Sequence, residues 1–355
     1  MKFCRKAEFS HAFVFSTQDK GRSLVPVNKS LLKYLSGSLT RMLLLLASAS
    51  MLSFFLVTAS PMNAVDAFLG EINVSDEQRA HIEGQWDLDK PPLQRYVIWA
   101  KRALHGDLGR SVSLHQPVAS VLRERFKASL LLMGTAWTLS GALGLVLGVA
   151  AGTYRDSWLD KIVRTFSLVL ASTPTFWIGL LVLVVFAVEL RWFPLGLSIP
   201  IGRLASEVTW GERLHHLVLP ALTLSITGVA NIALHTRQKL IDVLESEYVV
   251  FARARGETLG QIIRRHGLRN IALPAVTLQC ASVSELFGGS VLAEKVFSYP
   301  GLGATAVEAG LHADAPLLMG IALFSVLFVF AGNLAANLIY GFVDPQIREG
   351  GRSSV

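Results

Sequence analysis

The sequence predicts an all-α polytopic membrane protein with six transmembrane helices, and three observations support this fold class. Of the 355 residues, 52% are hydrophobic and only 17% are charged, whereas soluble proteins usually carry about a quarter charged residues. Several runs approach or exceed the roughly 18–20 apolar residues that cross about 30 Å of hydrocarbon. Basic residues gather in alternate loops, which is typical of the cytoplasmic face of a membrane protein.

The first part of the chain is expected to be a basic cytoplasmic extension, residues 1–38, followed by a span over residues 39–58. A cleaved signal peptide is the alternative for this span, but so long a basic extension argues against it. Residues 59–125 form the longest hydrophilic stretch and are expected to lie outside the cell. They include a helix-like run from Leu93 to Leu104.

Residues 126–341 are expected to form a membrane domain of five further spans, followed by a cytoplasmic tail over residues 342–355. The expected spans cover residues 126–152, 163–188, 217–235, 271–291 and 317–340. In the first of them, Gly144, Gly148 and Gly152 recur at four-residue spacing, and such small residues let helices pack closely in lipid. Pro174 removes a helix hydrogen bond, so it predicts a kink or a break in the next span.

Charge predicts that both termini face the cytoplasm. The segment 236–270 holds seven basic residues against four acids, whereas residues 294–316 hold a single basic residue, Lys295. A net charge of +7 also raises the question of nucleic acid. Cytoplasmic loop charge explains this excess better, so no nucleic-acid partner is expected.

Motifs of catalysis are missing from the sequence. There is no Gly-rich loop ending in Gly-Lys-Ser/Thr, no His-Glu-x-x-His pair and no Gly-x-Ser-x-Gly elbow, so neither an ATP site nor a protease is indicated. The two cysteines, Cys4 and Cys280, have no neighbours of a metal or redox motif. We therefore expect no enzymatic activity, no catalytic residue, no metal site and no cofactor bound by this chain.

The charged segment 236–270 is predicted to form two short helices bent at a glycine. Residues 247–255 contain no helix breaker, Gly256 supplies the stop, and Thr258 is placed to cap a second helix through Arg265. Ala252 and Gly256 lie one helical turn apart, so they are expected to leave a smooth patch for a close-fitting partner. Arg253 and Arg255 flank that patch and are suited to pair with carboxylates.

This segment resembles the coupling loop of bacterial ABC-importer permeases in the branch that handles peptides, nickel and opines. The residues that carry the resemblance are Glu247, Tyr248, Ala252, Arg253, Ala254, Arg255, Gly256, His266, Leu268, Arg269 and Asn270. The stretches 106–111, 296–303 and 344–348 are also similar to motifs of that branch. The chain departs from the pattern at Val250 and at residues 60–63.

The resemblance implies a type I ABC-importer permease fold in the bacterial inner membrane. Cytoplasmic ATP-binding subunits would dock at the coupling loop and use the ATP, and a second permease, usually a related but different chain, would complete the pore. An external solute-binding protein would deliver short peptides or nickel, free or chelated. The sequence Glu285-Leu286-Phe287-Gly288-Gly289 leans slightly toward the nickel-type group.

Three polar residues within the expected spans are candidates for the translocation path. Glu285 carries a carboxylate that is expensive in lipid, and its alternatives are a structural hydrogen bond or a place near the outer interface. Asn231 and His235 share one helix face, as do Asn333 and Asn337. Such pairs either join helices or help to pass a metal.

Two other protein classes remain as alternatives. The first is a secondary transporter or channel that works alone, and the second is a purely structural membrane anchor. Copurification with an ATPase separates them from the importer, because neither needs one.

Overall fold

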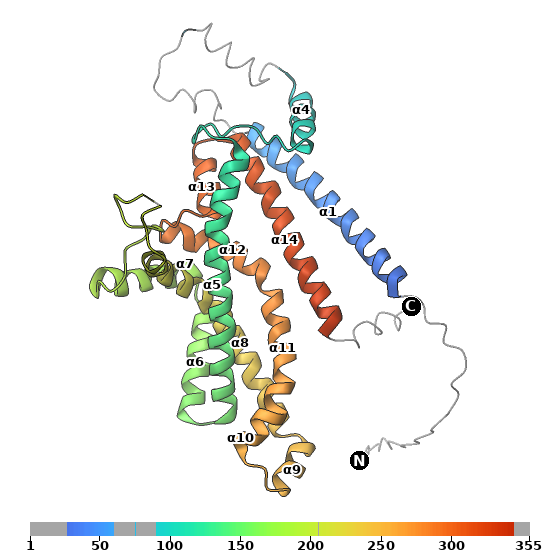
Figure 1. Cartoon of the computed structure of the whole chain (residues 1–355), viewed down its shortest axis with the longest axis vertical. Coiled ribbons are helices and arrows are strands. Elements are labelled where there is room, and N and C mark those ends of the chain that lie inside the picture. Colours follow the sequence, from blue (N-terminus) through green and yellow to red (C-terminus); the bar gives the residue numbers. More distant parts are fainter. Residues whose placement is uncertain (1–26, 60–74, 76–89, 205, 344–355) are drawn as a thin grey trace, which may run out of the picture. The chain divides into compact units, whose positions relative to one another are not determined.

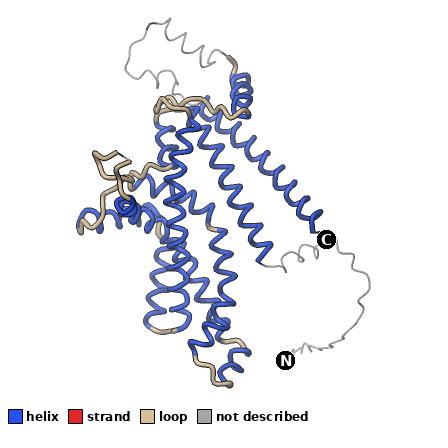
Figure 2. Tube along the Cα trace, viewed as in Figure 1, coloured by secondary structure: helices blue, strands red, loops and turns tan. Residues whose placement is uncertain are grey.

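The computed structural model describes residues 27–59, 75, 90–204 and 206–343 (Figure 1). The chain divides into two units, residues 1–43 and residues 44–355. Within the described part, the first unit contains only the beginning of helix α1 (Val27–Thr58). The second unit is helical wherever the structure describes regular elements, apart from one isolated bridge between Arg110 and Pro117 (Figure 2). The all-α prediction is therefore confirmed.

Among the described residues, four helices are long and apolar enough to cross a membrane. They are α1 over residues 36–58, α5 (Val118–Thr153), α8 (Trp210–Leu244) and α14 (Ala315–Val343) over residues 315–337. Two bent pairs raise the number of candidate spans to six. A polytopic membrane protein is thus confirmed, with helix ends that extend beyond most of the expected spans.

The expected break at Pro174 is confirmed. Helix α6 (Trp158–Ser172) ends before an extended Thr173, and α7 (Thr175–Leu183) starts after Pro174 at 110° to it. A π-helix, η1 (Val184–Glu189), continues α7. Proline cannot donate a backbone hydrogen bond, and it drives the preceding residue out of the helical region.

The fifth span was expected to be one helix over residues 271–291, and this is wrong. Helices α11 (Leu268–Ala281) and α12 (Val283–Val296) meet at Ser282 with a bend of 51°. The carbonyl oxygen of Gln279 accepts from the Ser282 hydroxyl and from Trp137 Nε1, each at 2.8 Å. In a continuous helix the N–H of residue 283 would donate to this carbonyl. Because the two side-chain donors occupy it, the backbone hydrogen bonding of the helix is interrupted there.

Helices α5 and α8 pack closely along the predicted glycine stripe. A Cβ on Gly144 would lie 2.7 Å from Cβ of Ile232, and one on Gly148 would lie 2.6 Å from Cβ of Thr236. Such distances leave no room for a side chain. The packing role that the spacing predicted is confirmed.

Two apolar clusters hold the second unit together. One joins α5, α8 and α12 through residues that include Leu132, Leu217 and Leu286. The other joins the start of α5 to α13 (Leu302–Leu311) and α14. Both clusters join helices of the membrane domain expected over residues 126–341, and the second also includes residues 118–122 at the start of α5.

The hydrophilic stretch contains the expected helix, α4 (Pro92–Leu104). The hydroxyl groups of Ser50 on α1 and Tyr96 on α4 lie 2.9 Å apart. Helix α1 begins at Val27, so it starts inside the segment expected to be a basic extension. The motif at residues 344–348, the departure at residues 60–63 and the tail 342–355 lie outside the described residues, except for the end of α14.

Candidate functional site

The segment that follows α8 forms an elbow, residues 247–270. It consists of α9 (Glu247–Ala254), a turn at Gly256, α10 (Leu259–Ile262) and a π-helix, η2 (Ile263–Gly267), that leads into α11. Gly256 has φ +85°, a conformation that favours glycine. Thr258 is the N-cap of α10, and its N–H donates to Gln261 Oε1 at 2.8 Å. The predicted pair of helices bent at a glycine is confirmed, and Figure 1 shows α9 and α10 together at one end of the helices.

The elbow has a small apolar core of its own. Val249, Ala252 and Ile262 pack with Val243 at the end of α8, and each is at most 5% exposed. Ala252 is fully buried, so the expected surface patch of Ala252 and Gly256 is wrong: in this elbow Ala252 faces inward. Gly256 alone is exposed, with open space around it.

Glu257 connects several basic side chains within the elbow. Its Oε1 lies 3.5 Å from Arg255 Nη2 and 3.7 Å from Arg265 Nη1, and its Oε2 lies 3.3 Å from His266 Nε2. The Glu257 side chain is only 15% exposed. Sequence analysis did not single out this residue, because the resemblance covers the residues before and after it but not Glu257 itself.

His266 and Asn270 join the second half of the elbow to the first. Asn270 Nδ2 donates to the His266 carbonyl at 2.7 Å and to the Tyr248 hydroxyl at 3.4 Å. The rings of Tyr248 and His266 lie 5.9 Å apart. Three of the residues singled out by sequence therefore contact one another, although they lie on both arms of the elbow.

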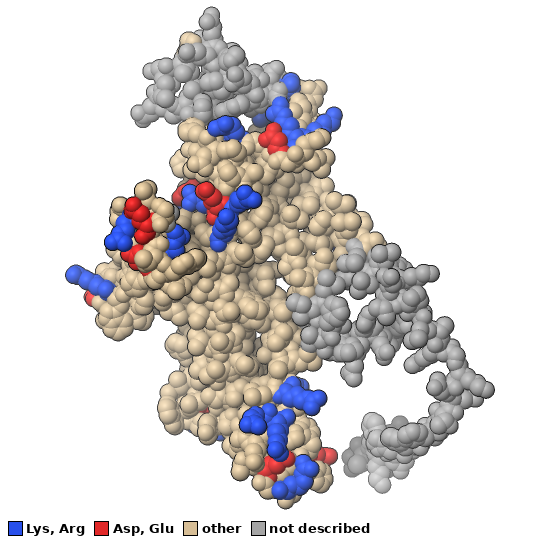
Figure 3. All heavy atoms as spheres, in the orientation of Figure 1, with Lys and Arg blue, Asp and Glu red and all other residues tan. Residues whose placement is uncertain are grey.

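The outer surface of the elbow is both apolar and basic. Val250 and Phe251 are 61% and 70% exposed, and Arg253 and Arg255 are exposed beside them. Further predicted residues that are exposed are Glu247, Tyr248, Ala254, Leu268, Arg269 and Asn270. Charged side chains crowd this end of the molecule in Figure 3. Sequence analysis missed Val250 and Phe251 as surface residues, although an apolar pair inside a charged loop was the available signal.

A buried ion pair connects α6 and α8 just before the elbow. Arg237 Nε lies 2.5 Å from Asp160 Oδ1, and Nη2 lies 2.7 Å from Oδ2. The Asp160 side chain is 2% exposed and that of Arg237 is 11% exposed. Asp160 Oδ2 also accepts from the Asp156 N–H at 2.9 Å. The carboxylate is therefore fully engaged, and it ties the two helices at one point.

At the opposite end, Glu294 on α12 holds the start of α13. Glu294 is fully buried; its Oε1 accepts from Ser129 Oγ at 2.6 Å, and its Oε2 accepts from the Ala304 N–H at 2.9 Å. Ser129 Oγ in turn accepts from the Leu302 N–H at 2.7 Å. A Cβ on Gly301 would overlap the Glu294 carboxyl group. The glycine in the 296–303 motif therefore makes room for this carboxylate.

Asp314 makes a second buried clamp at this end. Its Oδ2 accepts from Ser111 Oγ at 2.5 Å, from the Ser113 N–H at 2.9 Å and from Ser113 Oγ at 2.8 Å. Its Oδ1 accepts from the Leu317 N–H at 3.1 Å. The 106–111 stretch is thereby joined to the start of α14.

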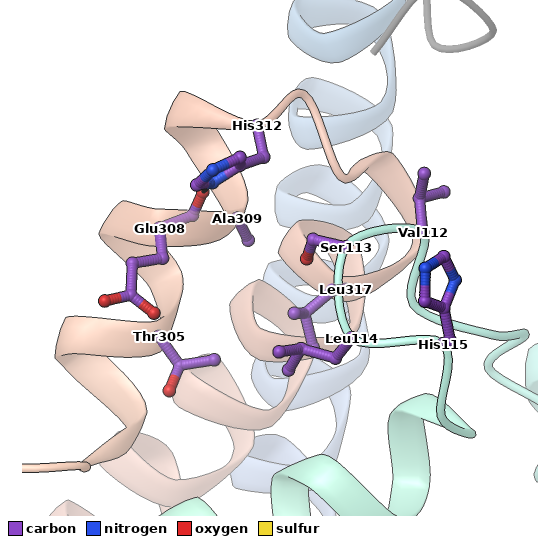
Figure 4. Close-up of a pocket in the computed structure, with 9 residues that line it drawn as sticks. All are labelled: Val112, Ser113, Leu114, His115, Thr305, Glu308, Ala309, His312 and Leu317. Atoms are coloured by element: carbon purple, nitrogen blue, oxygen red, sulfur yellow. Dashed lines mark hydrogen bonds between the residues drawn. The ribbon is translucent and has the colours of Figure 1, made fainter. Parts of the chain in front are cut away.

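A cavity of about 320 Å³ is lined by the 112–115 loop, by α13 and by Leu317 of α14. Figure 4 shows Leu114 and Leu317 between α13, which carries Glu308 and His312, and the loop that carries His115. Its floor is apolar and its rim is polar. Among the described residues, no three His, Cys, Asp or Glu side chains are grouped so that they could hold a metal ion.

The three candidate path residues are exposed on the surface of this single chain. Glu285 lies in the first turn of α12, next to the break with α11, and Asn231 and His235 lie on α8. None of the three has a side-chain hydrogen bond to another residue that the structure describes. Asn333 does join helices, because its Oδ1 accepts from Ser284 Oγ at 2.7 Å.

Comparison with known proteins identifies the family of this chain. A family described as "Binding-protein-dependent transport system inner membrane component" matches residues 144–349. The chain belongs to this family. It is a permease subunit of an ABC importer and a multi-pass protein of the bacterial inner membrane, not an enzyme; the ATPase and the binding protein are separate partners.

Two curated relatives resemble this permease over most of its length. The "Oligopeptide transport system permease protein AppB" of Bacillus subtilis (strain 168) is 32% identical over 85% of this chain and 95% of its own. The "Di/tripeptide transport system permease protein DppB" of Pseudomonas aeruginosa (strain UCBPP-PA14) is 32% identical over 84% of this chain and 94% of its own. The peptide branch expected from the coupling motif is thereby confirmed.

A solved structure supports the fold of the permease. One chain of "Inward facing conformations of the MetNI methionine ABC transporter: CY5 native crystal form" matches with a TM-score of 0.52 and 17% identity. The match covers 64% of this permease and 97% of that chain. At this identity the likeness concerns the fold alone, and it agrees with the type I permease fold expected from the sequence.

Proposed function

We propose that this permease carries short peptides across the inner membrane, driven by ATP hydrolysis in its partner subunits. The observation that supports this proposal is its similarity, over more than four fifths of the chain, to permeases of oligopeptide and di/tripeptide transport systems. Nickel, toward which the Glu285-Leu286-Phe287-Gly288-Gly289 sequence leaned, is the alternative cargo. The names of the relatives favour peptides over nickel.

The elbow is the proposed docking element for the ATPase. Phe251 and Val250 present an apolar surface of the kind that a partner groove buries, and Arg253 and Arg255 lie beside it to meet carboxylates. The apolar core of the elbow and the Glu257 contacts make it a compact unit. A compact elbow can transmit a movement of the ATPase to the membrane-spanning helices, whereas a flexible loop would deform instead.

Two contacts support transmission of this movement from the elbow to the membrane-spanning helices. A Cβ on Gly267 would lie 3.0 Å from Leu240 Cδ1, so η2 packs directly against α8. A few residues before, Arg237 of α8 holds α6 through Asp160. Movement of the elbow would therefore carry α8, α11 and α6 together.

A second permease subunit is proposed to cover the polar surface of α8 and α12. Glu285, Asn231 and His235 are exposed on one chain, and polar groups that face lipid are costly. Pairing with a second permease would place these side chains along a shared aqueous path instead. Glu285, beside the α11–α12 break, is then positioned to meet the cationic amino group of a peptide.

The coupling role is tested by Gly256→Trp. Gly256 has φ +85° and open space around it, so the indole would project from the elbow into the docking surface. We expect normal folding and insertion but loss of ATP-driven uptake. Gly106→Trp is the matched control, since Gly106 has the same φ of +85° and open space at the other end of the molecule. Normal uptake by the Gly256→Trp variant would remove the elbow from coupling.

The cargo is tested by uptake in a strain that lacks this gene, with and without the restored gene. Labelled dipeptide and radiolabelled nickel are compared under the same conditions. Restored dipeptide uptake alone supports the proposal, whereas restored nickel uptake alone replaces peptides by the metal. Glu285→Gln, assayed at equal protein level, then tests the path, since unchanged uptake would exclude Glu285 from it.

A further inference from the structure

The connection between η1 and α8, together with the first residue of α8, exposes large apolar side chains. Trp192 is 61% exposed, Leu195 62%, Ile201 89% and Trp210 74%. Water-facing loops seldom carry so many large apolar groups together, and contiguous exposed apolar surface marks an interaction site. We call these four residues the apolar rim.

The apolar rim is held outward by a hydrogen-bonded backbone. The Leu197 N–H donates to the Phe297 carbonyl at 2.9 Å, and ring nitrogens of His216 and His215 lie 2.9 Å from the carbonyl oxygens of Gly196 and Trp192. Arg203 Nη1 lies 2.6 Å from Glu212 Oε1. With the backbone fixed in this way, the exposure of the side chains is a property of the fold.

The depth of the apolar rim follows from α8. The sequence from Leu214 to Thr236 contains no Lys, Arg, Asp or Glu. At 1.5 Å per residue this stretch spans about 35 Å, close to the thickness of the hydrocarbon core. Arg237 marks the end near the elbow and Arg213 marks the other end. The apolar rim, which precedes Arg213, therefore lies at the outer boundary of the hydrocarbon.

The chemistry of the rim suits that boundary. Tryptophan is enriched where hydrocarbon meets headgroups, because its ring is apolar and its N–H is polar. Arg213 lies 5.9 Å from the ring centre of Trp210, as a cation above an aromatic face. The preceding helix η1, which extends α7, continues the surface: the ring centres of Phe186 and Trp192 lie 6.0 Å apart, and Val185 and Val188 are exposed. This continuity with an apolar helix favours lipid over a protein partner.

We propose that the apolar rim enters the headgroup region of the outer leaflet and anchors the outer ends of α7 and α8 to the membrane surface. The anchor would keep these helix ends at constant depth while the elbow moves α8 from the other end. The partner is the lipid interface itself, and no protein contact is required.

Spin labelling in lipid nanodiscs tests the anchor on the assembled importer. Ile201→Cys is labelled in a background in which Cys4 and Cys280 are serine, and collision of the label with oxygen and with a water-soluble nickel chelate is measured. Gln116→Cys is the matched control, because Gln116 is exposed and polar on another outer loop. We expect the label at position 201 to favour oxygen and the label at position 116 to favour the chelate.

Either of two results would overturn the proposal. Equal chelate access at positions 201 and 116 would place the rim in water. Protection of the position 201 label from both reagents would show that protein covers the rim. Leu195→Cys is labelled in parallel, so that the rim is still probed if the Ile201→Cys variant does not assemble. The same oxygen preference is expected at position 195.

Discussion

At the scale of single residues, three buried carboxylates organise the ends of the helices. Asp160, Glu294 and Asp314 are all buried. Each accepts hydrogen bonds from backbone N–H groups or hydroxyls at the start of a helix, where the helix dipole also favours negative charge. A buried carboxyl group is tolerated when its oxygens accept hydrogen bonds in this way, so these residues are sensitive positions.

Gly301→Ala is expected to destabilise the permease by about 1–3 kcal/mol, the usual range for overpacking. The new methyl group would overlap the Glu294 carboxyl group, so either the carboxylate or α13 must move. Thermal unfolding in detergent measures the change. Gly310→Ala is the control, because nothing lies within 4 Å of its added Cβ and alanine favours the helix. An equal melting temperature for both variants would contradict the clamp.

Asp160→Asn is expected to cost about 3–5 kcal/mol, because it leaves the Arg237 guanidinium buried without its counter-charge. The same thermal assay measures this loss. Asp156→Asn provides the comparison, since the side chain of Asp156 is 77% exposed, and it should change the melting temperature little. If Asp160→Asn melts as the unmodified protein does, the pair does not hold α6 to α8.

At the scale of elements, the elbow behaves as a small folded unit between two spans. It has apolar residues in its interior, ionic contacts through Glu257 and a glycine turn with positive φ. The local signals of this element were readable from sequence, because a helix stop and an N-cap are set by neighbouring residues. The inward side of Ala252 was not readable, because it depends on how α9 folds back toward α10 and α8.

Glu257→Gln is expected to weaken coupling while leaving insertion intact. The amide removes the charge that Arg255, Arg265 and His266 share, so the two arms of the elbow lose their fixed angle. We expect a severalfold fall in uptake per ATP hydrolysed, measured in reconstituted vesicles. Asp242→Asn, an exposed carboxylate on α8, should keep the ratio unchanged. An unaltered ratio for Glu257→Gln would show that the contacts are incidental.

At the scale of the whole molecule, the elbow and the 106–116 loop are expected on opposite sides of the membrane. This orientation is tested with a membrane-impermeant maleimide on single-cysteine variants that lack Cys4 and Cys280. Gln116→Cys should react in intact cells, whereas Arg253→Cys should react only after the membrane is opened. Labelling of Arg253→Cys in intact cells would invert the predicted topology.

The sequence alone determined the class of the protein, the approximate spans, the break at Pro174 and the glycine turn of the elbow. These features depend on residues close together in the sequence, because hydropathy, charge placement and the residues that start and stop helices act over short distances along the chain. Only the tertiary structure decided which polar residues are buried and paired. Ser129 and Glu294 are 165 positions apart, Ser111 and Asp314 are 203 apart, and Asp160 and Arg237 are 77 apart. No local pattern joins such residues, so the clamps become visible only when the helices are packed.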